Sequence, residues 1–144
     1  MMLADTNVLV NAFNAGAERH SQYKAWVEAM VNGPEPYGVA EFALTELVRI
    51  VTDPRIFGSP APLAQALEFT SIIRGQPHAE VVSPGGRFWE IFADLCRQAD
   101  AVGKLVPDAY LAALALERGC ELITADRDFR RFPGLRWRHP LDRP

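Results

Sequence analysis

Short apolar runs alternate along the chain with longer segments in which apolar residues recur every three or four positions. The short runs predict strands over 2–4, 37–39, 80–82, 121–124 and 135–137. The periodic segments predict a helix that starts at Asp5-Thr6 and stops at Gly16, and further helices over 18–31, 41–51, 63–73, 87–98 and 108–118. Strands that alternate with helices are typical of an α/β/α sandwich around a mostly parallel sheet.

Two of the predicted helices differ from the others in how much of their surface is apolar. The helix over 108–118 follows Pro107, stops before Gly119 and is apolar on all sides, so we expect it at the centre of the fold. The helix over 41–51 gathers its polar residues on one arc, and most of it should be buried. No internal repeat or linker interrupts the pattern, so we expect a single domain over 1–144.

The composition is that of an ordinary globular protein, with 49% apolar and 23% charged residues in a chain of 144. Only two cysteines occur, which excludes a disulfide framework and a zinc pattern and fits a reducing compartment. No apolar run approaches the roughly 20 residues that a membrane span needs, and no basic segment precedes an apolar one at the start. We therefore expect a cytoplasmic protein that does not bind a membrane.

The net charge of −3 is unevenly distributed, because six of the 13 arginines fall within 127–144, where only two aspartates oppose them. An acidic body with an arginine-rich edge suits a metal ion and a phosphate backbone together. An ordinary solvated surface explains the same charges, and charge alone favours that interpretation.

Two aspartates follow directly on predicted strands, Asp5 after 2–4 and Asp126 after 121–124. Sites in open α/β sheets form beyond the carboxyl ends of the strands, so the two side chains face one crevice if these strands are neighbours. Asp108 lies in the first turn of the helix expected to be buried, where free N–H groups and the helix dipole favour a carboxylate. Glu46 borders a largely apolar helix, where burial is costly unless the carboxylate is paired or binds a cation.

Each of these acids also has a purely structural interpretation. Asp5 and Asp126 can cap helices, Asp108 can be an ordinary first-turn acid, and Glu46 can pair with Arg49. Their joint occurrence favours a site, because several carboxylates close together repel one another unless a divalent cation compensates them. A ligand set made only of oxygen atoms suits Mg²⁺ or Mn²⁺ better than zinc.

Four segments carrying these acids resemble, in order and spacing, the motifs of PIN-domain ribonucleases, and most closely those of the VapC toxins of bacterial toxin–antitoxin pairs. The segments are Leu3-Ala4-Asp5-Thr6-Asn7-Val8-Leu9, Thr45-Glu46-Leu47-Val48-Arg49, Val106-Pro107-Asp108-Ala109-Tyr110 and Thr124-Ala125-Asp126-Arg127-Asp128-Phe129. The likeness spans nearly the whole chain and is weakest between 53 and 76.

The resemblance implies a PIN-like fold and an endoribonuclease that depends on Mg²⁺ or Mn²⁺ and cleaves RNA by a metal-activated water. It also implies a homodimer and a cognate VapB-type antitoxin. By motif position, the catalytic and metal-binding acids are Asp5, Glu46, Asp108 and Asp126, and the residues that orient them are Asn7, Thr124 and Asp128. We also expect an apolar dimer patch on the helices over 18–31 and 63–73.

Three arginines follow the fourth acidic motif, Arg127, Arg130 and Arg131. They lie close enough to the expected site to hold RNA phosphates, but ordinary surface pairing with Asp128 explains them equally well.

Two other functions deserve comparison with an endoribonuclease. A phosphatase of the haloacid-dehalogenase type needs a second aspartate two residues after the first, where this chain has Asn7, and we discount it. A non-catalytic PIN-like module that binds an antitoxin or RNA without cutting is the remaining alternative, which the complete acid set disfavours.

Overall fold

The computed structural model describes residues 1–143, so that only Pro144, the last residue of the predicted domain, lies outside it. Five short strands form one sheet: β1 (Met2–Ala4), β2 (Tyr37–Val39), β3 (Ala79–Val81), β4 (Glu121–Ile123) and β5 (Trp137–Arg138). Their order across the sheet is β3-β2-β1-β4-β5, and every neighbouring pair is parallel.

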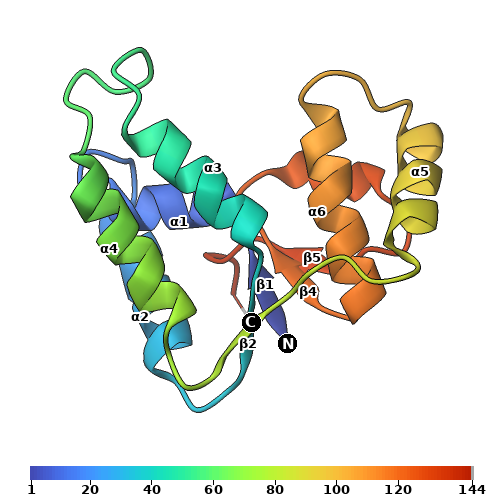
Figure 1. Cartoon of the computed structure of the whole chain (residues 1–144), viewed down its shortest axis with the longest axis horizontal. Helices are drawn as coiled ribbons and strands as arrows, with labels where there is room; N and C mark the ends of the chain where they lie inside the picture. The colour runs from blue at the N-terminus through green and yellow to red at the C-terminus, as the bar shows by residue number, and fades with distance from the viewer. Residues whose placement is uncertain (144) are drawn as a thin grey trace.

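Six α-helices and one 3₁₀ helix surround this sheet (Figure 1). They are α1 (Thr6–Phe13), α2 (His20–Asn32), α3 (Glu41–Val51), α4 (Leu63–Arg74), α5 (Phe88–Ala99), α6 (Leu105–Arg118) and η1 (Arg127–Arg131). Helices α1 to α4 form one half of the molecule, and α5 and α6 form the other (Figure 1). The predicted α/β architecture with a mostly parallel sheet is confirmed. No helix within residues 1–143 is long and apolar enough to cross a membrane.

The strands divide their side chains between two apolar cores, because successive residues of a strand point to opposite faces. Leu3 packs with α5 and α6, whereas the next residue, Ala4, packs with α1 to α4. In the first core, α6 is buried from Leu111 to Ala115, as its all-round apolar pattern predicts. At the centre of β2, a side chain on Gly38 would approach the Val82 side chain to 2.9 Å and the Leu3 side chain to 3.2 Å, so both would have to shift to admit it.

Helix α6 begins earlier than the sequence indicates. We expected its start after Pro107, but the first helical residue is Leu105. Proline is tolerated there because the first four N–H groups of a helix have no partner within the helix. The earlier start brings Lys104 to the helix boundary, next to the acidic motif.

The central strands β1 and β4 end side by side, since Ala4 is paired with Ile123. From β1 the chain builds the sheet outward through β2 and β3, then returns to add β4 on the other side. The strand order therefore reverses between β1 and β4, which is where open α/β sheets form their crevice.

Candidate active site

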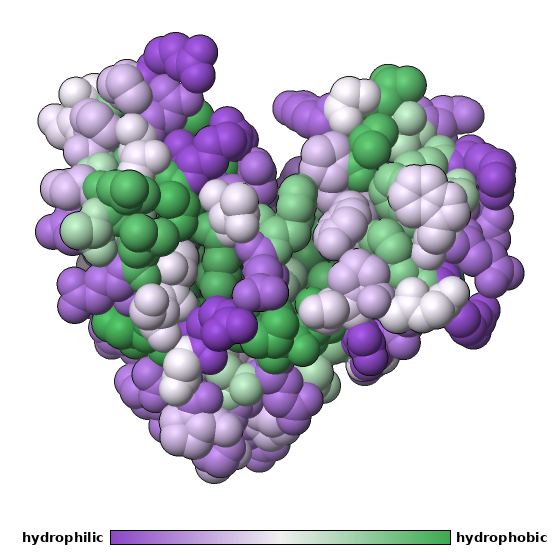
Figure 2. Space-filling view, in the orientation of Figure 1, coloured by the Kyte–Doolittle hydropathy of each residue, from purple (hydrophilic) through white to green (hydrophobic). Residues whose placement is uncertain are grey.

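A cleft of about 400 Å³ opens at the carboxyl ends of β1 and β4, between α3 and α6. The space-filling view shows the molecule hollowed between its two halves (Figure 2). All four predicted acids line this cleft: Asp5, Glu46, Asp108 and Asp126. They come from four different segments, so the fold brings together residues that lie up to 121 positions apart in the sequence, from Asp5 to Asp126.

Asp5 lies at the floor of the cleft, with only 8% of its surface exposed. Its Oδ1 accepts a hydrogen bond from the N–H of Thr6 at 2.6 Å, and Oδ2 accepts from the Thr124 hydroxyl at 2.8 Å. Burial raises the pKa of Asp5 above its usual value, while the hydrogen bonds from Thr124 and Thr6 partly offset this rise. The charge of Asp126, which lines the same cleft, raises the pKa of Asp5 slightly further.

Asn7 and Thr124 link the two strand ends. The Asn7 side-chain N–H₂ donates to Asp5 Oδ2 and to the Thr124 hydroxyl, both at 3.2 Å. Its Oδ1 accepts from the Ala125 N–H at 3.0 Å, and the Thr124 hydroxyl accepts from the Asp126 N–H at 3.0 Å. Thr124 is fully buried, so its hydroxyl is fixed in place. These contacts match the orienting role expected of the two residues, which remains a prediction.

Asp108 lines the cleft from the first turn of α6, and its side-chain carboxylate accepts no hydrogen bond from any described residue. Burial raises its pKa from 3.8 to about 6, and the charges of Asp5 and Asp126 contribute to the rise. The ammonium of Lys104 acts in the opposite direction and lowers the pKa of Asp108. A half-buried carboxylate without hydrogen-bond donors, facing two others, is stabilised by any cation that enters the cleft.

Glu46 lines the cleft from α3 and is also paired with Arg49 one turn later. The Arg49 Nη2 lies 2.9 Å from Glu46 Oε2. Both the expected place of Glu46 in the acidic cleft and the alternative ion pair are therefore present in the structure.

Comparison with known proteins agrees with the acidic motifs. Residues 2–135 match the PIN domain family. The chain is 39% identical over 142 residues to ribonuclease VapC43 of Mycobacterium tuberculosis (strain ATCC 25618 / H37Rv), and this alignment covers 99% of the chain and 97% of that relative. This chain belongs to the VapC ribonucleases. The predicted family, and with it the expectation of a ribonuclease, is confirmed.

Two solved structures share the fold. VapBC2 from Rickettsia felis, bound to a DNA fragment from its promoter, superposes with a TM-score of 0.69 at 19% identity and covers 96% of this chain and 97% of its own. A toxin–antitoxin complex from Klebsiella pneumoniae gives a TM-score of 0.65 at 20% identity, with 99% of both chains covered. At such identities the likeness shows the PIN fold alone.

The arginines predicted to hold RNA in this VapC chain lie outside the cleft. Arg127 pairs with Asp142 at 3.0 Å rather than with Asp128, and Arg130 and Arg131 are exposed at the end of η1. Asp128 is also exposed and donates its backbone N–H to Asp126 Oδ1 at 2.9 Å.

The cationic side chains that line the cleft are Arg49 and Lys104, neither of which the sequence analysis singled out as functional. The spacing of Lys104 could have indicated its place. It precedes Asp108 by four residues, and side chains four residues apart lie on the same side of a helix.

The donor set of the cleft fits a hard divalent cation of the Mg²⁺ type. All four acidic side chains offer oxygen, and the pKa of Asp108 is raised by burial first and then by the neighbouring carboxylates, both of which disfavour a negative charge that a cation would stabilise. Within residues 1–143, no three His, Cys, Asp or Glu side chains are gathered tightly enough to enclose a metal ion. Mg²⁺ does not require such an enclosure, since it keeps several waters and uses one or two carboxylates together with substrate phosphates.

A second hollow, of about 510 Å³, lies at the far end of α3 between Phe13 and the loop around Phe57. None of the described residues that line it carries a titratable side chain. A hollow without titratable side chains offers no group for acid–base catalysis or metal binding, so the acidic cleft remains the candidate active site.

Proposed function

We propose that this VapC chain is the toxin of a VapBC-type pair and an endoribonuclease that requires Mg²⁺ or Mn²⁺. The observation that carries the proposal is the convergence of Asp5, Asp108 and Asp126 on one cleft, where their burial and mutual repulsion raise the pKa of Asp108 to about 6. Charges held together at such an energetic cost are typical of functional sites.

Each residue of the cleft has a distinct role in this proposal. Asp5 and Asp108 hold the cation, and Asp126 and Glu46 complete the acidic surface around it. Asn7 and Thr124 fix the orientation of Asp5 through the hydrogen bonds described above. When bound, the metal ion supplies activation of water at neutral pH and compensates the negative charge of the phosphodiester.

The chain itself provides position and protonation state. Above a pH of about 6 the Asp108 carboxylate is ionised and available to a cation, whereas below it a proton occupies the same oxygens. Hydrolysis of the phosphodiester by water yields a 5′-phosphate and a 3′-hydroxyl, because the water oxygen joins the phosphorus and the 3′-oxygen leaves.

The proposal is tested by incubating the purified chain with total RNA in Mg²⁺, in Mn²⁺ and in EDTA. We expect discrete fragments with 5′-phosphate ends that appear only with metal and disappear in Asp5→Asn. Asp94→Asn, an exposed acid on α5, is the matched control and should cut normally. Fragments ending in 2′,3′-cyclic phosphate, or cleavage in EDTA, would contradict it. Metal-independent RNA binding without cleavage would instead support the non-catalytic module.

The same proposal includes a VapB-type antitoxin and a homodimer. The complexes from Rickettsia felis and Klebsiella pneumoniae support an antitoxin partner. Helix α4 supports the dimer, because Leu63, Leu67 and Ile72 are about half exposed on it. Helix α2, the other predicted part of the dimer patch, turns Tyr23, Val27 and two further apolar residues inward. Light scattering on the chain and on Leu67→Glu should give a dimer and a monomer, respectively.

A further inference from the structure

Two cationic side chains line the acidic cleft. Arg49 belongs to the α3 wall and Lys104 to the α6 wall, and both line the cleft together with the four acids. We propose that Arg49 and Lys104 bind the RNA phosphates that flank the scissile bond, one on each wall. This inference rests on the proposed ribonuclease function and names the residues that hold its substrate.

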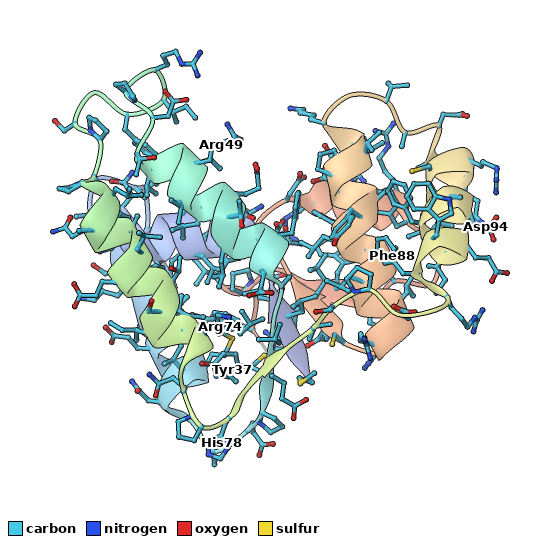
Figure 3. All side chains as sticks on the ribbon, in the orientation of Figure 1. Tyr37, Arg49, Arg74, His78, Phe88 and Asp94 are labelled. Atoms are coloured by element: carbon cyan, nitrogen blue, oxygen red, sulfur yellow. The ribbon has the colours of Figure 1, made fainter. Side chains whose placement is uncertain are left out.

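Arg49 has hydrogen-bond donors left over for a phosphate. Its ion pair with Glu46 engages Nε and Nη2, whereas a guanidinium offers five N–H donors in a planar fork. The side chain is 58% exposed, so the remaining donors reach solvent. Figure 3 shows Arg49 on the part of α3 that borders the gap to α6. The pair with Glu46 therefore positions the guanidinium without saturating it.

Lys104 immediately precedes α6 and is exposed. Its ammonium forms no ion pair or hydrogen bond with any residue in the described range 1–143. Its ammonium nevertheless lies close enough to Asp108 to lower the pKa of that carboxyl. A lysine that lines a cleft beside an acid, yet is not paired with it, keeps its three N–H donors available to an incoming anion.

The charge balance of the cleft requires such groups. Four carboxylates line the cleft against only two cationic side chains, so the cleft by itself repels a polyanion. One divalent cation neutralises the excess negative charge of the cleft, but it does not by itself attract the phosphates on either side of the scissile bond. RNA binding depends on cationic side chains that neutralise backbone phosphates, and Arg49 and Lys104 are the cations in position to do so.

The chain offers unusually close control variants for each residue. Lys24 is the only other lysine, lies on α2 and pairs loosely with Glu28 at 3.9 Å. Arg97 on α5 pairs with Asp94 at the same i,i+3 spacing as Arg49 with Glu46, and Figure 3 places Asp94 on the outer side of α5, away from the cleft. Lys24→Gln and Arg97→Gln therefore remove the same charges at positions remote from the cleft.

The experiment measures binding of a fluorescein-labelled single-stranded RNA of mixed sequence by fluorescence anisotropy, across a series of NaCl concentrations at constant Mg²⁺, with each reading taken before the RNA is cut. Lys104→Gln and Arg49→Gln should each weaken binding by roughly threefold to tenfold and reduce the slope of log Kd against log salt by about 0.7, the value for one lost phosphate contact on a single strand. Lys104→Arg should restore both quantities. In the cleavage assay with Mg²⁺, the same two variants should raise KM more than they lower kcat.

The outcomes separate this inference from the proposed function. If Lys104→Gln and Arg49→Gln match Lys24→Gln and Arg97→Gln in affinity and slope, the inference is overturned, while metal-dependent cleavage by the unmodified chain still supports the ribonuclease. If the unmodified chain does not cleave RNA but binds it with the expected dependence on Arg49 and Lys104, the inference stands and the ribonuclease is overturned. If the unmodified chain does not bind RNA, both fail.

Discussion

Asp5, at the end of β1, accepts hydrogen bonds from three donors, whereas Asp108, in the first turn of α6, accepts none from the described residues. Both carboxylates face the same cleft, and burial raises the pKa of both. At Asp5 the strand ends supply donors that partly compensate the buried charge. At Asp108 nothing but the nearby Lys104 ammonium does so, and the pKa rises to about 6.

The difference shows how one cation site can combine a ligand that is already oriented with a ligand whose charge is not yet compensated. The donors around Asp5 hold one ligand in a defined orientation before any ion arrives. The unsatisfied carboxylate of Asp108 provides the driving force, because it gains most when a cation replaces a proton. We expect substitutions in the two regions to change stability in opposite directions.

The largest expected effect is on catalysis by Asp108→Asn. Loss of one cation ligand removes several kcal/mol of transition-state stabilisation, so cleavage should fall about a hundredfold or more. The same change removes a repelled, half-buried charge and should raise the melting temperature at neutral pH. Cleavage rates and calorimetry on the same preparation check both parts. A variant that loses activity and also melts earlier would indicate general damage instead.

Addition of Mg²⁺ tests whether Asp108 holds the cation. The cation should raise the melting temperature of the unmodified chain at neutral pH, with a stabilisation of about 2.7 kcal/mol at one hundred times the Kd. Asp108→Asn should respond much less, and NaCl of equal ionic strength should not reproduce the shift. An identical response of both proteins would mean that Asp108 does not hold the ion.

Thr124→Val tests the donors around Asp5. Valine keeps the shape but removes a buried hydroxyl that donates to Asp5 and accepts from the Asp126 N–H. The free energy of unfolding should fall by about 2 kcal/mol. Thr45→Val, which removes an exposed hydroxyl on α3, should change it by less than about 0.5 kcal/mol. Urea titration measures the free energy of unfolding of both variants. Equal losses would show that the hydrogen bond from Thr124 to Asp5 does not stabilise the fold more than an exposed hydroxyl does.

The smallest effect is the pH dependence of the stability gained by Asp108→Asn. Because the pKa of Asp108 rises from 3.8 to about 6 on folding, the folded chain keeps a proton that the unfolded chain releases within this window. The ionised Asp108 therefore destabilises the fold increasingly as the pH rises through the window. The gain in melting temperature should vanish below pH about 4 and reach full size above pH about 6. A gain independent of pH would contradict the raised pKa.

Much of the fold was predictable because it follows from local pattern. The central position of α6 follows from its apolar circumference, and its end follows from Gly119, which adopts the left-handed conformation that favours glycine. The boundaries were less predictable, since Pro107 suggested a start that the helix extends beyond. The predicted start, three residues too late, left Lys104 away from the helix, whereas in the structure it directly precedes α6 and lines the cleft.

The sequence by itself determined that Asp5 and Asp126 directly follow strands, because short apolar runs that end at a polar residue mark the strands locally. Only the tertiary structure decided that β1 and β4 are neighbours, that Arg127 pairs with Asp142, and that the cleft cations are Arg49 and Lys104. The physical reason is that these contacts join residues far apart in the sequence. Ion pairs and the sharing of a cleft depend on how segments far apart in the chain pack together, and charge patterns along the sequence do not contain that information.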